Sequence, residues 1–175
     1  VCLPISQFKN PHGLDEEGHY STARDMARLG QALIHDQPEE YKIYSQKSFV
    51  FNGITQHNRN RLLWRDASVD GIKTGHTSAA GYCLMASAKR GDQRLISVVL
   101  GSTSEEQRAV DSQALLNWGF RFYESHRLYD AGKSIATQRV WNPTRIISPQ
   151  RKSRQGVVGG RKPSSRASAP LTSPT

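Results

Sequence analysis

Apolar residues recur at helical spacing in one early stretch of the chain. Met26, Leu29 and Leu33 stand three or four positions apart, with a Ser-Thr pair at 21–22 before them that can cap a helix. Pro38 follows the last of them and ends the pattern. The sequence therefore predicts an amphipathic helix here, whose role is packing.

Three later stretches have the pattern of β-strands. Residues 48–56 alternate around Asn52-Gly53, which is a strong signal for a tight hairpin. Residues 81–89 and 94–101 are two apolar segments joined by a short polar turn, which predicts an antiparallel hairpin. Residues 95–100 are nearly all apolar, so we expect this arm to be central or well covered.

A second long helix is expected after this hairpin. Thr103 and Glu106 fit a capping box, and Arg108 falls within the first two turns. The apolar residues that follow predict a stripe facing the core, formed by Val110, Ala114, Leu115, Trp118 and Phe122. Helices and antiparallel strands together indicate an α+β fold, in which helices pack on an antiparallel sheet.

Composition divides the chain into three parts. Residues 1–123 carry the patterns above, and residues 124–145 contain short β-like pieces that look like the start of a small β-rich domain. Residues 146–175 hold six basic and no acidic residues among many Ser, Pro and Gly, which predicts a disordered basic tail. The first 145 residues have a net charge of only +3, so the formal charge of +9 is mostly a property of the tail.

Other features of the sequence exclude little. No leader peptide or run of apolar residues long enough to span a membrane is visible, and the first residues look like the middle of a protein. We expect Cys2 and Cys83 to be unpaired.

Two polar clusters have residue types that also occur in binding sites. The histidines and acids of residues 12–19 lack the spacing of a metal site and are interrupted by Gly13 and Gly18, so a solvated loop explains them better. Residues 58–61 resemble a nucleic-acid patch, but apolar residues 62–64 follow at once. A loop leading into a buried anchor is the better interpretation.

The candidate chemistry lies in the Lys-Thr-Gly triplet at residues 73–75. Lys73 offers an ammonium whose pKa falls when it is partly desolvated, so it can polarise a nucleophile or pass a proton. Thr74 offers a hydroxyl donor for a carboxylate, and Gly75 lets a ligand backbone lie close along the strand. By itself the triplet also fits a strand that simply ends in a turn.

Several longer motifs in order give the triplet a context. They are Pro11-His12-Gly13-Leu14-Asp15, Tyr20-Ser21-Thr22-Ala23-Arg24-Asp25-Met26-Ala27, Phe51-Asn52-Gly53-Ile54, Asn58-Arg59-Asn60, Leu62-Leu63-Trp64, residues 69–77, Arg94-Leu95-Ile96-Ser97 and Trp118-Gly119-Phe120-Arg121-Phe122. With these motifs the chain, from about residue 3 to residue 141, resembles the C-terminal part of the penicillin-recognising domain of bacterial D-alanyl-D-alanine carboxypeptidases. These are low-molecular-mass penicillin-binding proteins with a β-lactamase-like fold.

The resemblance implies roles for specific residues. Lys73 is expected to stand beside the serine nucleophile and also to bind the substrate together with Thr74, Gly75 and Arg108. Thr74 and Arg108 are expected to contact the terminal carboxylate of the substrate. The backbone amide of His76 would be an oxyanion-hole donor. The implied reaction is acyl transfer, in which a serine attacks, D-Ala leaves and water hydrolyses the acyl-enzyme.

The chain departs from the family where the nucleophile should be. The family's Ser-x-x-Lys and Ser-x-Asn motifs lie upstream of the Pro-His-Gly loop, and we expect neither region in this chain. Ser6-Gln7-Phe8-Lys9 has the right spelling but the wrong place, and we interpret it as a coincidence. We therefore expect a fragment without carboxypeptidase activity of its own.

Three other functions remain open. The chain can be a non-catalytic remnant that binds peptide termini, or a relative of the serine β-lactamases, although no Glu-x-x-x-Asn loop stands upstream of Lys73. The basic tail can bind nucleic acid or an anionic surface without specificity.

The family also implies partners and a location. The expected partners are peptidoglycan stem peptides ending in D-Ala-D-Ala and β-lactam antibiotics, with no specific nucleic acid and no cofactor or metal. For the intact protein, the family implies a periplasmic, inner-membrane-associated enzyme of cell-wall synthesis and cell shape.

Overall fold

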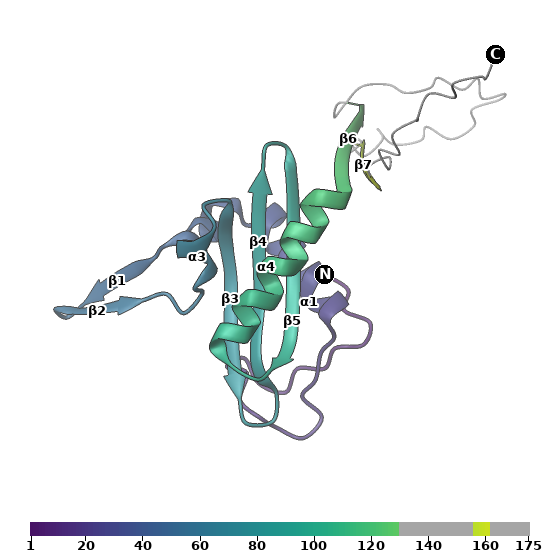
Figure 1. Ribbon diagram of the computed structural model, residues 1–175. Helices are drawn as coiled ribbons and strands as arrows, with labels where there is room; N and C mark the ends of the chain where they lie inside the picture. The colour runs from purple at the N-terminus through teal and green to yellow at the C-terminus, as the bar shows by residue number, and fades with distance from the viewer. Residues whose placement is uncertain (130–155, 162–175) are drawn as a thin grey trace, which may run out of the picture. The chain divides into compact units, whose positions relative to one another are not determined.

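The computed structural model describes residues 1–129 and 156–161, and the chain divides into two compact units, Val1–Phe120 and Arg121–Thr175. The chain contains helices and antiparallel strands, in agreement with the α+β prediction (Figure 1). None of the helices in the described residues is long and apolar enough to cross a membrane. The elements up to the second unit are α1 (Ala23–Asp36), α2 (Pro38–Tyr41), the 3-10 helix η1 (Lys42–Ser45), β1 (Ser48–Phe51), β2 (Ile54–His57), α3 (Leu62–Arg65), β3 (Val69–Thr77), β4 (Gly81–Arg90), β5 (Gln93–Ser102) and α4 (Glu105–Phe122).

Helix α1 begins and ends where its sequence predicts. The Thr22 hydroxyl accepts a hydrogen bond from the backbone amide of Asp25 at 3.2 Å, which caps the first turn. At the other end the Gln37 amide donates to the Leu33 carbonyl, and Pro38 begins the next helix. The Asp25 carboxylate is buried and accepts hydrogen bonds from Ser6 and Ile5, which holds the N-terminal segment against α1.

Strands β1 and β2 form the predicted hairpin. Asn52 and Gly53 both have positive φ, 48° and 74°, as a two-residue turn with the right twist requires. All eight residues of the two strands are exposed.

The main sheet contains β3, β4 and β5 in that order, all antiparallel. Its register places Lys73 opposite Met85 and Gly75 opposite Cys83. The hairpin of β4 and β5 was predicted correctly. Residues 95–100 were expected to be central or well covered: they do not form the middle strand, but all of them except Leu100 are buried or half-buried. Among the described strands of this sheet only β4 pairs on both sides, so it is the middle strand and the more deeply buried one.

The two faces of the sheet carry separate cores. Successive residues of β4 point to opposite faces, so Leu84 packs in the cluster that includes Leu116 of α4, and Met85 packs in the cluster that includes Leu33 of α1. Helix α4 covers one face and α1 lies on the other (Figure 1). The sheet is therefore held between two helical layers.

Helix α4 buries a different face from the one predicted. Val110, Leu115 and Trp118 are 44–52% exposed, whereas the buried positions are Arg108, Ala109, Ser112, Leu116, Gly119 and Phe120. Small residues decide this orientation, because a Cβ at Gly119 would lie 2.6 Å from Leu95 on β5. The N-terminus also differs by one residue: the Ser104 hydroxyl, not Thr103, accepts from the Gln107 amide.

The second unit is described only in part. Strand β6 (Tyr123–Tyr129) pairs antiparallel with β7 (Gly156–Arg161). Strand β7 lies inside the segment 146–175 that was predicted to be disordered, so these six residues differ from that expectation; their Val-Val pair favours a strand. The other residues of the predicted β-rich start (124–145) and of the tail beyond those in β6 and β7 lie outside the described residues.

Candidate active site

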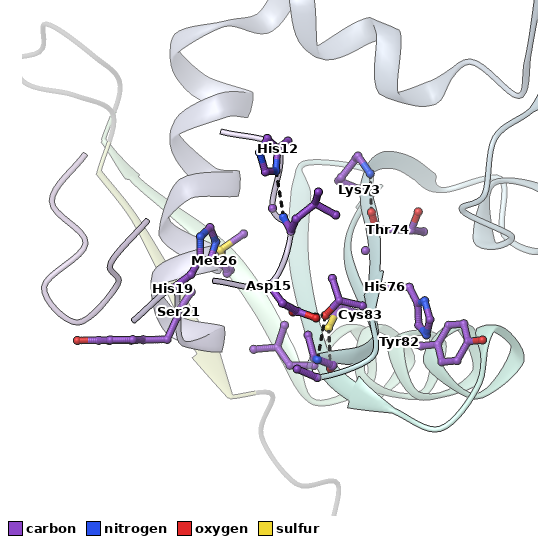
Figure 2. A pocket seen from close by; sticks show the side chains of 18 of the residues that line it. His12, Asp15, His19, Ser21, Met26, Lys73, Thr74, His76, Tyr82 and Cys83 are labelled. Carbon is purple, nitrogen blue, oxygen red and sulfur yellow. Dashed lines mark hydrogen bonds between the residues drawn. The ribbon is translucent and has the colours of Figure 1, made fainter. Parts of the chain in front are cut away.

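A cavity of about 1620 Å³ opens in the first unit beside the exposed edge of β3. The N-terminal loop forms one wall and β3 the other, and the start of α4 adds Arg108. Figure 2 shows Asp15 and His12 of the loop on one side and Lys73, Thr74 and His76 of β3 on the other. All five residues that the sequence analysis assigned to the site, Lys73, Thr74, Gly75, His76 and Arg108, line this cavity.

Lys73 contributes an amine to the lining of the cavity. Partial burial lowers the pKa of this ammonium group, and the positive charges of Arg59 and Arg108 lower it further. Its Nζ donates a hydrogen bond to the carbonyl of Thr74. A lysine with a depressed pKa can exchange a proton with a neighbouring hydroxyl more readily than an ordinary surface lysine can.

Arg108 is the buried cation of the site. Only 3% of this residue is exposed, and its guanidinium donates to the Gly75 carbonyl at 3.2 Å and lies 3.5 Å from Glu105. It also lies 5.5 Å from the centre of the Tyr82 ring. A guanidinium fixed in this way presents its remaining donors in a constant orientation, which suits a carboxylate.

The second half of β3 carries the buried residue Thr74 and the ring of His76, which contacts Tyr82. Thr74 is 9% exposed, and the His76 ring packs on Tyr82 with 4.0 Å between centroids. The register pairs His76 with Tyr82 across β3 and β4. The role assigned to the His76 backbone amide stays a prediction.

The loop opposite β3 is held by its own polar groups. The Asn10 side chain bonds Gly13, Leu14 and Glu16, and the histidines at 12 and 19 accept backbone hydrogen bonds from Leu14 and Lys9. No three His, Cys, Asp or Glu side chains in the described residues gather as a metal site would need. The hydrogen bonds of Asn10, His12 and His19 agree with the polar-loop interpretation.

One hydrogen bond ties this loop to the end of β3. The Thr77 hydroxyl lies 2.6 Å from a carboxylate oxygen of Asp15 and accepts from the Ala80 amide. Figure 2 shows the Asp15 side chain pointing from the loop towards Cys83. Asp15 and Thr77 both line the cavity, so this bond joins its two walls.

Arg59 is a cavity residue that the sequence analysis did not assign. It lines the cavity, and its charge acts on Lys73. Its neighbour Asn60 is buried and donates to the Gly71 carbonyl at 3.0 Å, while Leu62 is fully buried behind it. The predicted anchor is therefore present in Leu62 and Leu63, whereas Trp64, which was expected to belong to it, is 48% exposed. The signal for Arg59 was its place shortly before this anchor.

Ser6 does not belong to the site. Its hydroxyl donates to Asp25 at 2.8 Å, and it is not among the residues that line the cavity. The helix after it begins at Ala23, so Ser6 does not start a helix. Both observations support the interpretation of Ser6-x-x-Lys9 as a coincidence. Cys2 and Cys83 are both free, as predicted.

Comparison with known proteins gives consistent matches. The sequence model of the family described as D-alanyl-D-alanine carboxypeptidase matches residues 3–104. D-alanyl-D-alanine carboxypeptidase DacA of Escherichia coli K12 is 55% identical over 140 residues, covering 79% of this chain and 35% of that protein. The crystal structure of penicillin binding protein 5 from Haemophilus influenzae superposes with a TM-score of 0.78 at 46% identity, over 91% of this chain and 47% of that chain.

A further solved structure is similar over less of the chain. Penicillin-Binding Protein D2 from Listeria monocytogenes, in its cefotaxime-bound form, has a TM-score of 0.57 at 37% identity, over 62% of this chain and 45% of that chain. The chain spans about a third of the length of the Escherichia coli protein it matches. These structures confirm the predicted fold class, a mixed helix and antiparallel-sheet domain of penicillin-binding type. By its sequence and its fold, the chain belongs to the D-alanyl-D-alanine carboxypeptidase family of penicillin-binding proteins.

Proposed function

We propose that this chain forms the substrate-carboxylate wall of a serine D-alanyl-D-alanine carboxypeptidase. The observation that carries the proposal is the convergence of Lys73, Thr74 and Arg108 on one cavity beside the free edge of β3. A peptide can lie along that edge as an added strand, with its C-terminal carboxylate against Arg108 and Thr74. Its substrate would be a peptidoglycan stem peptide ending in D-Ala-D-Ala.

Each site residue has a definite role in this proposal. Lys73, whose pKa is lowered, exchanges a proton with the serine hydroxyl that attacks the penultimate D-Ala carbonyl carbon. The His76 amide stabilises the oxyanion that forms, and the terminal D-Ala leaves as a free amino acid. Water then hydrolyses the acyl-serine ester.

The chain by itself is proposed to bind but not to turn over. Ser6 starts the one Ser-x-x-Lys sequence present, and its hydroxyl is bound to Asp25 outside the cavity. Oxyanion donors and a carboxylate site do not replace a missing nucleophile. For the intact protein we propose a periplasmic, inner-membrane-associated location, because its substrate is the cell wall.

The intact mass of the purified chain, before and after incubation with benzylpenicillin, tests this proposal. An unchanged mass is expected, together with saturable binding of a peptide ending in D-Ala-D-Ala and no release of D-Ala. A covalent penicilloyl adduct would show that a serine of this chain is activated, and Ser6 would be the first residue to map.

A second candidate function is a peptide-terminus-binding module without catalysis in any assembly. It is supported by the same cavity, because binding a carboxylate requires only Thr74 and Arg108. Addition of a separately expressed family segment carrying the Ser-x-x-Lys and Ser-x-Asn motifs discriminates the two: D-Ala release from the mixture supports the enzyme. The serine β-lactamase alternative is less well supported, since the family matched is that of the carboxypeptidases.

A further inference from the structure

The hairpin formed by β1 and β2 exposes apolar side chains that a soluble surface normally covers. Figure 1 shows it projecting away from the sheet of β3, β4 and β5. Scattered exposed apolar residues are common, but a contiguous group on a projecting element marks an interaction site. Here four such side chains within six residues are 57–67% exposed: Phe49, Val50, Phe51 and Ile54.

The register gathers these side chains at the tip on both faces of the hairpin. Phe51 pairs with Ile54 next to the turn, and the rings of Phe49 and Phe51 stack on the same face with 6.3 Å between centroids. Val50 lies on the opposite face. One face of the tip is therefore apolar, with Phe49, Phe51 and Ile54, whereas the other carries Val50 beside Thr55.

The base of the hairpin is basic. Lys47 stands directly before β1 and Arg59 two residues after β2, and both are exposed. Residues 42–65 contain five basic residues and no acid. Three of the five, Lys42, Arg61 and Arg65, form ion pairs with glutamates, but in the described part of the chain neither Lys47 nor Arg59 pairs with a carboxylate.

An apolar tip above a basic base matches the polarity of an anionic bilayer surface. Each strand has four residues, so the hairpin is about 13 Å long at roughly 3.3 Å per residue. Interfacial segments bury their apolar side about 5–10 Å deep, which would place Phe51 and Ile54 at the acyl boundary and Lys47 among the headgroups. A second copy of the chain fits less well, because its equally basic hairpin would bring like charges together.

We propose that the β1–β2 hairpin is an interfacial anchor, which inserts Phe49, Phe51 and Ile54 into a bilayer of anionic phospholipid. The inserted side chains do not line the cavity beside β3, and the proposal does not depend on the function proposed for that cavity. Because the inserted side chains make few contacts with the rest of the protein, their replacement leaves the fold intact.

Vesicle flotation of the full chain tests the proposal. Vesicles of phosphatidylcholine with phosphatidylglycerol are compared with vesicles of phosphatidylcholine alone, for the wild type and the double variant Phe49→Ser with Phe51→Ser. The double variant is expected to bind the anionic vesicles about tenfold or more weakly, through lost apolar burial. Val110→Ser, which removes a similarly exposed apolar side chain from α4, is expected to bind as the wild type does.

Every variant keeps the full chain with the same basic residues 146–175. A difference in vesicle binding between variants therefore comes from the substituted residues and not from residues 146–175. Equal vesicle binding by the wild type and the double variant would overturn the proposal. It would also be overturned by a concentration-dependent dimer, seen by sedimentation without lipid, that the double variant abolishes. A Phe51→Trp variant supplies a depth measurement: bromine-labelled acyl chains are expected to quench its added fluorescence, and unquenched emission would contradict insertion.

Discussion

The Arg108 guanidinium donates a hydrogen bond to the carbonyl oxygen of Gly75 at 3.2 Å, which connects the start of α4 to the strand that carries Lys73. The arginine is 3% exposed, so its charge is largely desolvated and aimed at the cavity. A second interaction with Glu105, at 3.5 Å, compensates part of that charge. The same side chain therefore fixes the geometry of β3 and supplies its anion site.

Replacing Arg108 is expected to weaken carboxylate binding. Arg108→Ala should lower the affinity for a D-Ala-D-Ala peptide about tenfold or more, because a charge-assisted hydrogen bond contributes about 1.5–3 kcal/mol. Arg108→Lys keeps the charge but loses the planar fork, so its affinity should be intermediate. NMR titration measures both, with the C-terminal amide of the same peptide as control. If Arg108→Ala binds the free acid and the amide with the same affinities as the wild type does, the carboxylate site lies elsewhere.

The pKa of the Lys73 amine should depend on the charge of Arg59. The positive charge of Arg59 contributes to the lowered pKa of Lys73, so Arg59→Gln should raise that pKa and slow acylation of Lys73 at a fixed alkaline pH. Labelling with an acetyl ester, read by peptide mass spectrometry across pH, measures the change. Arg61→Gln is the matched control, because Arg61 pairs with the glutamates of α4. An equal effect of both substitutions would mean that only net charge matters.

The sequence predicted the elements of this fold better than their orientation. The turn at Asn52-Gly53 and the cap at Thr22 follow from local chemistry, and both are present. The buried face of α4 does not, because apolar residues occur on more than one side of that helix. Close packing of Gly119 against Leu95 selects the face, and such a contact is invisible until the two elements are brought together.

In the candidate site, too, the sequence predicted some residues and could not predict others. Lys73, Thr74 and Gly75 are adjacent in sequence, so one motif finds them together. Arg59 and Asp15 come from loops whose positions depend on tertiary hydrogen bonds, those of Asn60 to β3 and of Asp15 to Thr77. No periodicity in the sequence indicates either bond.

The attachment of the N-terminal segment to α1 should depend on pH. Burial alone raises the pKa of the Asp25 carboxyl, but hydrogen bonds from Ser6 and Ile5 outweigh it, with help from Arg28, and hold the pKa below its usual value. A carboxyl with a lowered folded pKa stabilises the fold above its unfolded pKa of about 4, and this contribution is lost as pH falls through the folded value.

Hydrogen exchange of residues 3–9, followed by mass spectrometry, measures this effect. After correction for intrinsic rates, Asp25→Asn should exchange roughly fivefold or more faster than the wild type at pH 7, with the difference vanishing well below pH 4. Asp36→Asn, at the exposed end of the same helix, serves as control. A difference that persists unchanged at low pH would contradict a role for the carboxylate charge.

The polar cluster behind β3 should contribute to stability. Burial raises the pKa of the Tyr41 phenol well above its usual value, so it stays protonated and donates to Asp70 at 2.8 Å. Arg94 pairs with the same carboxylate at 2.7 Å and donates to Ser87. Tyr41→Phe should lower the free energy of unfolding by about 1 kcal/mol, and Arg94→Leu by about 2–3 kcal/mol, since Asp70 then loses its cationic partner and keeps only the Tyr41 hydroxyl.

Urea unfolding measures these two changes. Arg24→Leu, which replaces an exposed arginine of α1, should change the unfolding midpoint little. A larger effect at Arg24 than at Arg94 would show that net charge, rather than the cluster, sets the stability.

The apolar groove between β5 and α4 should drive self-association. The groove is lined by Asp111 and by six apolar residues: Val98, Val99, Leu100, Ala114, Leu115 and Trp118. In the described residues β5 pairs only with β4, so its other edge is open beside this groove, and an open apolar edge promotes aggregation. Leu115→Glu places a charge in the groove and should reduce light scattering at a given concentration several-fold.

Val110→Glu makes the same charge change on the same helix, at a residue that is similarly exposed but outside the groove. Equal light scattering from the two variants would mean that association depends on overall charge, whereas a loss specific to Leu115→Glu would identify the groove as the associating surface.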